Sequence, residues 1–232
     1  MLKQKSRLTL AVVLVAATVL VAGGVAIASN TGFKINLPLP ITVVGSPNVG
    51  NTWASLPYFN PYPNGQVLCS QLGLRTTVPQ ATLLRIDPVS GVSTPANCGA
   101  AAAGFTWYAG QGVRIRNTAG AGAPTSAIVV GSHNPATALT IPPSGAGNIG
   151  NLWFAVPYHT TAVNGQDLCN SIGLVSTGAV GTRGSLLRNN AATGATTPGI
   201  CGSTAATIVL QLGEAIRTRQ PGGVASFVPA HF

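Results

Sequence analysis

Short runs of apolar or alternating residues recur along the chain, and clusters of Gly, Pro and Asn separate them. Such runs are typical of short β-strands joined by turns. In the first half of the chain they predict strands over residues 53–58, 81–86, 105–109, 113–115 and 127–130. Frequent short strands with turns between them indicate a sandwich or a barrel.

One helical pattern interrupts these strands. Asn64 can cap a short helix that places Leu68 and Leu72 on one face. Gly73 then supplies the left-handed residue that commonly ends a helix. The same four positions recur 100 residues later as Asn164, Leu168, Ile172 and Gly173. The sequence therefore predicts two short helices at equivalent places.

This recurrence belongs to an internal repeat that covers most of the chain. Residues 50–74 return as residues 150–174, and 12 of these 25 positions are identical. The register then shifts by three residues, so that Cys98 corresponds to Cys201. Because a repeat of this kind determines the architecture, its two copies indicate two similar structural units.

We therefore predict a mainly β fold made of two tandem sandwich-like or barrel-like units. The first unit is expected over residues 33–127 and the second over residues 128–232. Each has the size of a small domain and contains one short helix.

The four cysteines fall two in each unit, at matching places. Four cysteines allow three pairings, and the matching places favour one disulfide within each unit, Cys69 with Cys98 and Cys169 with Cys201. Each bond would close a loop of about 30 residues and stabilise the fold by roughly 3 kcal/mol. A zinc site would require clustered cysteines, and a nucleophilic cysteine would require a matching histidine in the first unit, which has none.

The N-terminus predicts export. Three basic residues within the first seven precede the uncharged stretch 8–28, which ends in Ala26-Ile27-Ala28. This order is typical of a signal peptide over residues 1–28, cleaved before Ser29. An uncleaved membrane anchor is the alternative, because a stretch of this length could just span a bilayer of about 30 Å. We expect a secreted, periplasmic or cell-surface protein, which contacts a membrane only if this segment remains.

Charged residues make up only 6% of the chain, against about 25% in an average domain. The chain has 12 Lys or Arg and 3 Asp or Glu. Removal of residues 1–28 would leave 9 basic and 3 acidic residues, a net charge of +6. Few side chains are therefore available for acid–base or metal chemistry. No carboxylate pair recurs in both copies, and the sequence contains no Gly-x-Ser-x-Gly nucleophile motif or phosphate-binding glycine-rich loop. We expect a non-catalytic module without a cofactor, structural or adhesive in role.

The rival interpretation is a secreted hydrolase or metal-dependent enzyme in the second unit. His133, His159 and His231 all lie in that unit, and Asp167 or Glu214 could serve beside His159. Imidazole is a common metal ligand. The histidines lack the spacing of a metal-binding motif, so no bound metal ion is expected.

Two arginine pairs are the best candidates for binding. Arg114 and Arg116 correspond to Arg217 and Arg219 in the second unit. A spacing of two on a strand places both side chains on one face. Since three acids cannot neutralise them, they are candidate anion-binding residues for an anionic cell-surface polymer or a neighbouring subunit. An ordinary solvated strand face is the alternative. Nucleic acid is not expected, because export separates the protein from it.

The aromatic residues Trp53 and Tyr58 recur as Trp153 and Tyr158. They could form a sugar-binding platform if they are exposed. Their alternation with small residues favours burial in the core, where such side chains contribute most apolar area.

The same segments carry a resemblance. Residues 51–58 read Asn-x-Trp-x-Ser-Leu-Pro-Tyr and residues 156–161 read Val-Pro-Tyr-His-Thr-Thr, each followed by Leu-Cys and later by Cys-Gly. These motifs resemble duplicated cysteine-containing units of uncharacterised secreted bacterial proteins, over roughly residues 40–232. The resemblance implies export and a β-rich module, and it transfers no activity or functional residue.

Overall fold

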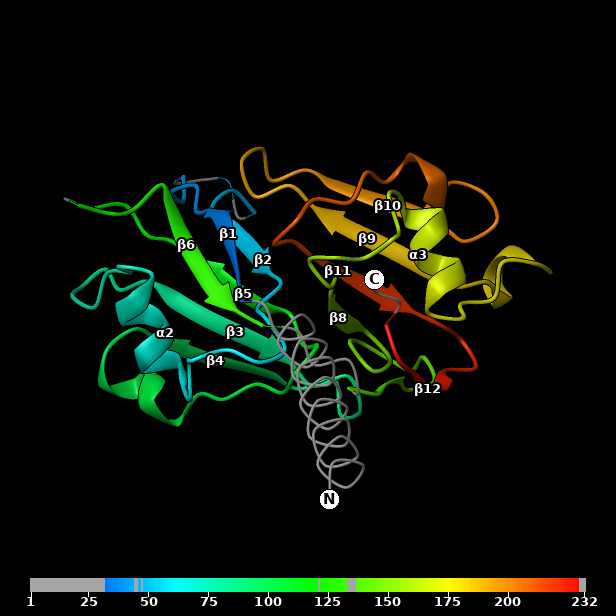
Figure 1. Ribbon diagram of the computed structural model, residues 1–232, viewed down its shortest axis with the longest axis horizontal. Coiled ribbons are helices and arrows are strands. Elements are labelled where there is room, and N and C mark those ends of the chain that lie inside the picture. Colours follow the sequence, from blue (N-terminus) through cyan, green and yellow to red (C-terminus); the bar gives the residue numbers. More distant parts are fainter. Residues whose placement is uncertain (1–31, 44–45, 47, 121, 133–136, 230–232) are drawn as a thin grey trace, which may run out of the picture. The chain divides into compact units, whose positions relative to one another are not determined.

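The computed structural model describes residues 32–43, 46, 48–120, 122–132 and 137–229 (Figure 1). The predicted signal peptide and its cleavage site lie outside these residues. Both repeats belong to one compact unit that begins at Lys34. Among the described residues, no helix has both the length and the apolar character needed to cross a membrane.

The two repeats contain corresponding elements in the same order, and the second has one additional short 3-10 helix, η2. The first repeat consists of β1 (Phe33–Pro38), β2 (Asn51–Ala54), α2 (Gly65–Gln71), β3 (Thr82–Ile86), β4 (Ser93–Asn97), η1 (Ala100–Gly104), β5 (Val113–Arg116) and β6 (Ser126–Gly131). The second consists of β7 (Leu139–Ile141), β8 (Leu152–Ala155), α3 (Gly165–Ser171), η2 (Val180–Thr182), β9 (Ser185–Asn189), β10 (Thr196–Ile200), η3 (Ala205–Thr207), β11 (Ala215–Arg219) and β12 (Val224–Phe227).

The strands form matching antiparallel sheets in the two repeats. The four-stranded sheets have the orders β2-β5-β3-β4 and β8-β11-β9-β10. A two-stranded sheet joins β1 to β6, and another joins β7 to β12. The prediction of a mainly β fold made of two tandem units is confirmed. The pairing of β6 with β1 joins the two ends of the first repeat.

Three of the five strands predicted in the first half of the chain form within one residue of the predicted bounds, as β3, β5 and β6. The strand predicted over 53–58 is shorter and lies earlier in the chain, as β2 over Asn51–Ala54. No strand forms over the predicted range 105–109. There the carbonyl of Phe105 instead accepts a hydrogen bond from the amide of Gly65 (2.7 Å), at the start of α2. The segment therefore closes the helix end rather than joining the sheet.

The two short helices begin and end as predicted. The side chain of Asn64 accepts a hydrogen bond from the amide of Val67 (3.1 Å), and Asn164 does the same for Gln166 (2.8 Å) and Asp167 (3.0 Å). Gly73 follows α2 with a φ of 65°, a value that a residue with a Cβ atom rarely adopts. These caps satisfy backbone groups that a helix of two turns would otherwise leave open.

Each repeat has its own apolar core. One side chain of the first repeat, Tyr58, lies in the core of the second. Leu68, Leu83 and Ile115 are fully buried in the core of the first repeat. Phe154 is fully buried in the core of the second repeat.

Backbone hydrogen bonds also cross between the repeats, and they come in equivalent pairs. The amide of Ser55 donates to the carbonyl of Gly213 (2.8 Å), and the amide of Ala155 donates to that of Gly110 (2.8 Å). Both acceptors precede the central strands β5 and β11. Each central strand therefore begins against an edge strand of the other repeat before it pairs within its own.

Candidate functional site

Both predicted disulfides are present. Cys69 in α2 is bonded to Cys98 after β4, and Cys169 in α3 is bonded to Cys201 after β10. All four cysteines of the chain are thereby used. The bonds indicate an oxidising environment outside the cytoplasm.

The first arginine pair lies on the strand face that the spacing predicts. Arg114 and Arg116 share one face of β5, while Val113 and Ile115 are buried on the other. Arg116 is exposed and Arg114 is half-buried. The guanidinium carbon of Arg114 lies 6.0 Å from the ring centre of Trp53, near the outer limit for a cation–π contact.

The environment of Arg114 disfavours its charge. Burial, and then the charge of Arg116, lower the pKa of Arg114. Its Nε atom is buried and has no hydrogen-bond partner among the described residues.

The second pair repeats this arrangement with one added contact. Burial, and then the charge of Arg219, lower the pKa of Arg217. The Nη2 atom of Arg219 donates to the carbonyl of Gly145 (3.1 Å). In both repeats the inner arginine is half-buried. The outer arginine is exposed in the first repeat, and in the second it is half-buried and donates to a loop carbonyl.

The tryptophans meet at the border between the repeats. The rings of Trp53 and Trp153 stack with their centres 3.6 Å apart and their planes at 4°. Their exposed fractions are 7% and 6%, so the stack offers no open sugar-binding platform. The hydroxyl of Tyr58 donates to the carbonyl of Ala155 in the other repeat (2.8 Å), and burial raises the pKa of Tyr58 well above its ordinary value.

The three acids each bind a group of the protein itself. Asp87 Oδ1 accepts hydrogen bonds from the amides of Val89 (2.8 Å) and Ser90 (3.0 Å), and the bond from Ser90 is the main cause that lowers the pKa of Asp87. Asp167 Oδ2 accepts from the amide of Val163 (3.2 Å). Glu214 forms an ion pair with Arg188.

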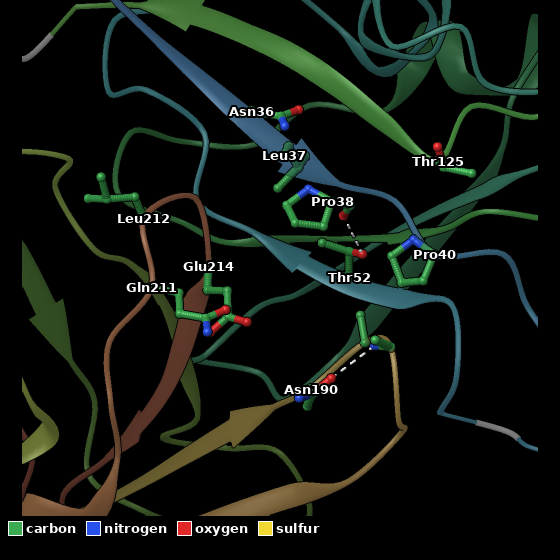
Figure 2. Close-up of a pocket in the computed structure, with 12 residues that line it drawn as sticks. Asn36, Leu37, Pro38, Pro40, Thr52, Thr125, Asn190, Gln211, Leu212 and Glu214 are labelled. Carbon is green, nitrogen blue, oxygen red and sulfur yellow. Dashed lines mark hydrogen bonds between the residues drawn. The ribbon is translucent and has the colours of Figure 1, made fainter.

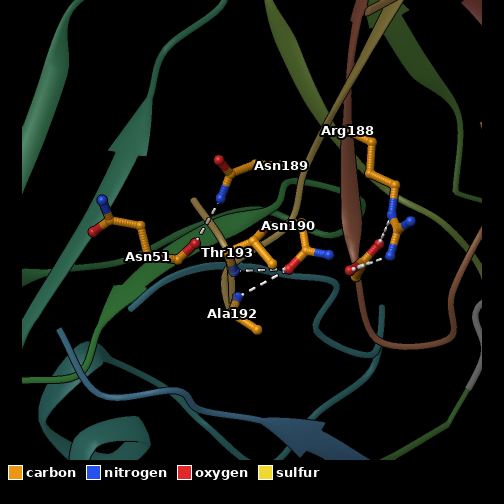
Figure 3. A network of polar contacts seen from close by, with 7 residues as sticks. Asn51, Arg188, Asn189, Asn190, Ala192 and Thr193 are labelled. Atoms are coloured by element: carbon orange, nitrogen blue, oxygen red, sulfur yellow. Dashed lines mark hydrogen bonds and ion pairs between the residues drawn. The ribbon is translucent and has the colours of Figure 1, made fainter. Parts of the chain in front are cut away.

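That ion pair is the only one within 4.0 Å among the described residues (Figure 3). Arg188 Nε lies 2.6 Å from Glu214 Oε2, and Arg188 Nη2 lies 3.1 Å from Glu214 Oε1. The contact is bidentate, a geometry that makes such pairs strong.

The histidines do not come together into a site within the described residues. His159 is buried, and its ring centre lies 4.3 Å from that of Tyr158. His133 and His231 fall outside the described residues. The part of the chain that the structure describes contains no group of three or more His, Cys, Asp or Glu side chains arranged to hold a metal ion.

A pocket of about 480 Å³ lies where the two repeats adjoin (Figure 2). The outward-facing residues Asn36, Pro38 and Pro40 of β1 and its continuation form one wall. The turn after β9 and the segment before β11 form the others, and they contribute Asn190 and Glu214.

Polar contacts hold the turn after β9 in place (Figure 3). The side chain of Asn189 donates to the carbonyl of Asn51 in the first repeat (2.8 Å). Asn190 Oδ1 accepts from the amides of Ala192 (3.0 Å) and Thr193 (3.2 Å). The wall that carries Asn190 is therefore fixed both internally and to the neighbouring repeat.

No protein-family model, curated protein or solved structure matches this chain. The pocket is thus interpreted from its own chemistry. Its walls come from segments far apart in the chain, so the sequence pattern does not predict it. One signal pointed to it: Asn190 and Glu214 stand where the first repeat has Asp87 and Gln111.

Proposed function

We propose that this protein is an exported, non-catalytic repeat protein with a structural or adhesive role at the cell surface or in the extracellular space. The observation that carries the proposal is that all three acidic side chains serve the fold. Asp87 accepts backbone hydrogen bonds in a turn, and Asp167 accepts one from the backbone amide just before α3. Glu214 forms an ion pair with Arg188. No carboxylate is left over for general acid–base catalysis, which supports a scaffold rather than an enzyme.

The proposed location is secreted, periplasmic or on the cell surface. Two disulfides in a chain of this size are typical of exported proteins. The basic, apolar and small-residue order of residues 1–28 supports export through cleavage.

The proposed partner is an anionic cell-surface polymer, with a neighbouring subunit as the second possibility. Arg116 is exposed, and the half-buried Arg114 lies on the same strand face. Arg217 and Arg219 repeat the arrangement. Two such faces on one chain would add avidity toward a polymer long enough to reach both.

Binding to an anionic polysaccharide tests this partner. Replacement of all four arginines by Gln should abolish binding, and binding by the natural protein should weaken steeply with salt, since charges are screened over about 8 Å at physiological ionic strength. Thermal stability serves as the control for folding. Binding that persists in the quadruple variant at low salt would contradict the proposal.

Cell fractionation and metal analysis test the role itself. We expect a chain that begins near Ser29 in the exported fraction and contains no stoichiometric metal ion. The matched variant is His159→Ala. A metal ion that is bound stoichiometrically by the natural protein and lost in this variant would favour the metal-dependent enzyme instead.

A further inference from the structure

The pocket between the repeats has walls without a net charge. Glu214 is its only charged lining residue, and the bidentate contact with Arg188 neutralises it. A neutral wall gives no electrostatic attraction to a phosphate, a carboxylate or an ammonium group. The pocket therefore suits an uncharged ligand, and its volume of about 480 Å³ falls within the range of about 300–1,000 Å³ usual for small-molecule sites.

Several polar side chains that line the pocket have unused hydrogen-bonding groups. Asn36, Thr125 and Gln211 form no side-chain hydrogen bond with any described residue. Asn190 uses only its oxygen, for the turn that follows it, so its amide nitrogen has no partner among the described residues. Side-chain amide and hydroxyl groups both donate and accept hydrogen bonds. A ligand that carries hydroxyl groups can therefore form hydrogen bonds of both kinds with them.

Apolar surface lies between these polar groups. Pro38, Pro40 and Leu212 line the pocket, and 62% of the Leu212 surface is exposed. Figure 2 shows these apolar side chains distributed among the polar residues that line the same pocket. A ring with polar edges and an apolar face matches such a mixed wall better than a purely apolar group does.

The two repeats differ in residue type at this place. Gln211 stands at the position of Tyr108, and Asn190 at the position of Asp87. In the first repeat burial, and then the charge of Asp87, raise the pKa of Tyr108 to about 12. The second repeat has neither the phenol ring nor the negative charge at these positions, and it presents two uncharged amides instead.

We propose that this pocket binds a neutral saccharide, with its hydroxyl groups bonded to the uncharged amides Asn36, Asn190 and Gln211 and an apolar C–H face against Pro38. This inference deepens the adhesive role proposed above and rests on it. The saccharide site is separate in chemistry from the arginine faces: it requires no charge on the ligand and should be insensitive to salt.

Titration by NMR tests the inference on the full mature protein. The probes are methyl glucoside, methyl galactoside and N-acetylglucosamine at millimolar concentrations, with glucuronic acid for comparison. We expect saturable shifts of amides that line the pocket for at least one neutral sugar, with a dissociation constant unchanged between low and high salt.

The first repeat supplies the matched variant. Gln211→Tyr should fill the pocket with the ring that Tyr108 carries and should weaken sugar binding by about tenfold or more. The reverse variant Tyr108→Gln should leave the affinity unchanged. A sugar bound equally well by Gln211→Tyr, no saturable shift with any neutral probe, or tighter binding of glucuronic acid than of every neutral sugar would each overturn the inference.

These outcomes separate the two proposals. Failure of sugar binding with retained, salt-sensitive binding to an anionic polysaccharide would remove the saccharide site alone. Sugar binding without binding to an anionic polysaccharide would contradict the proposed role of the arginines and leave the pocket as the adhesive site.

Discussion

Replacement of Tyr58 by Phe should destabilise the protein at neutral pH and make it less sensitive to alkali. The hydroxyl of Tyr58 is buried and donates to the carbonyl of Ala155 in the other repeat (2.8 Å). A typical intramolecular hydrogen bond contributes about 0.5–1.5 kcal/mol net, so the variant should lose about 1 kcal/mol at pH 7.

The alkaline effect has the opposite sign. Burial raises the pKa of Tyr58 in the folded protein, whereas an unfolded tyrosine ionises near pH 10. Above about pH 10 the unfolded chain therefore releases a proton that the folded chain keeps, and the free energy of unfolding falls by about 1.4 kcal/mol for each pH unit. Phe cannot ionise, so Tyr58→Phe escapes this loss.

The natural protein and Tyr58→Phe should therefore be equally stable between about pH 10.5 and 11. In that range, ionisation of the unfolded chain lowers the free energy of unfolding of the natural protein by about 1 kcal/mol, which equals the loss of the hydrogen bond in the variant. Urea denaturation at several pH values, with the disulfides kept oxidised, measures the crossing. Tyr108, whose pKa is raised to about 12, is present in both proteins and cancels in the comparison.

Tyr62→Phe provides the control for removal of a buried hydroxyl within one repeat, since Tyr62 accepts a hydrogen bond from the amide of Val130 (3.2 Å). A difference between Tyr58→Phe and the natural protein that stays constant from pH 7 to pH 11 would refute the reasoning. It would mean that Tyr58 ionises as easily in the folded protein as in the unfolded chain.

Three further predictions concern stability. Trp53→Ala should lower the free energy of unfolding by about 3–5 kcal/mol in urea, because it leaves a cavity against Trp153; a loss below 1 kcal/mol would contradict a packed border. Glu214→Gln should cost about 1–3 kcal/mol, because Arg188 would lose its charge partner, and an unchanged urea midpoint would show that the pair contributes nothing. The pKa of Asp87 is lowered, so its contribution is present above about pH 4 and lost as the pH falls further; Asp87→Asn should flatten the acid limb of stability, and an unaltered limb would argue against this role.

The sequence predicted what depends on local chemistry and on the repeat. Asn64 and Gly73 mark the ends of a helix because capping needs only neighbouring residues. The disulfides followed from the equal places of the cysteines in the two copies. The strand at 93–97 was not predicted, because its sequence Ser-Thr-Pro-Ala-Asn is polar and alternates only between exposed and half-buried positions.

The border between the repeats could not be predicted in the same way. The pattern indicated that Trp53 and Trp153 are buried, but each could have packed within its own core. Their stacking depends on how two sheets meet, which involves residues 100 positions apart. The pocket has the same origin, since its lining residues Asn36 and Glu214 come from different repeats.

The crossing contacts make the duplicated chain an intramolecular dimer. In a dimer of separate chains, the contacts between Ser55 and Gly213 and between Ala155 and Gly110 would weaken on dilution. Here the second copy is always supplied at a high effective concentration, so the pairing is independent of protein concentration. The copies also need not remain identical, as two identical subunits must. One half can change its surface while the other keeps its own, which is how a single polypeptide comes to carry an asymmetric pocket on a symmetric frame.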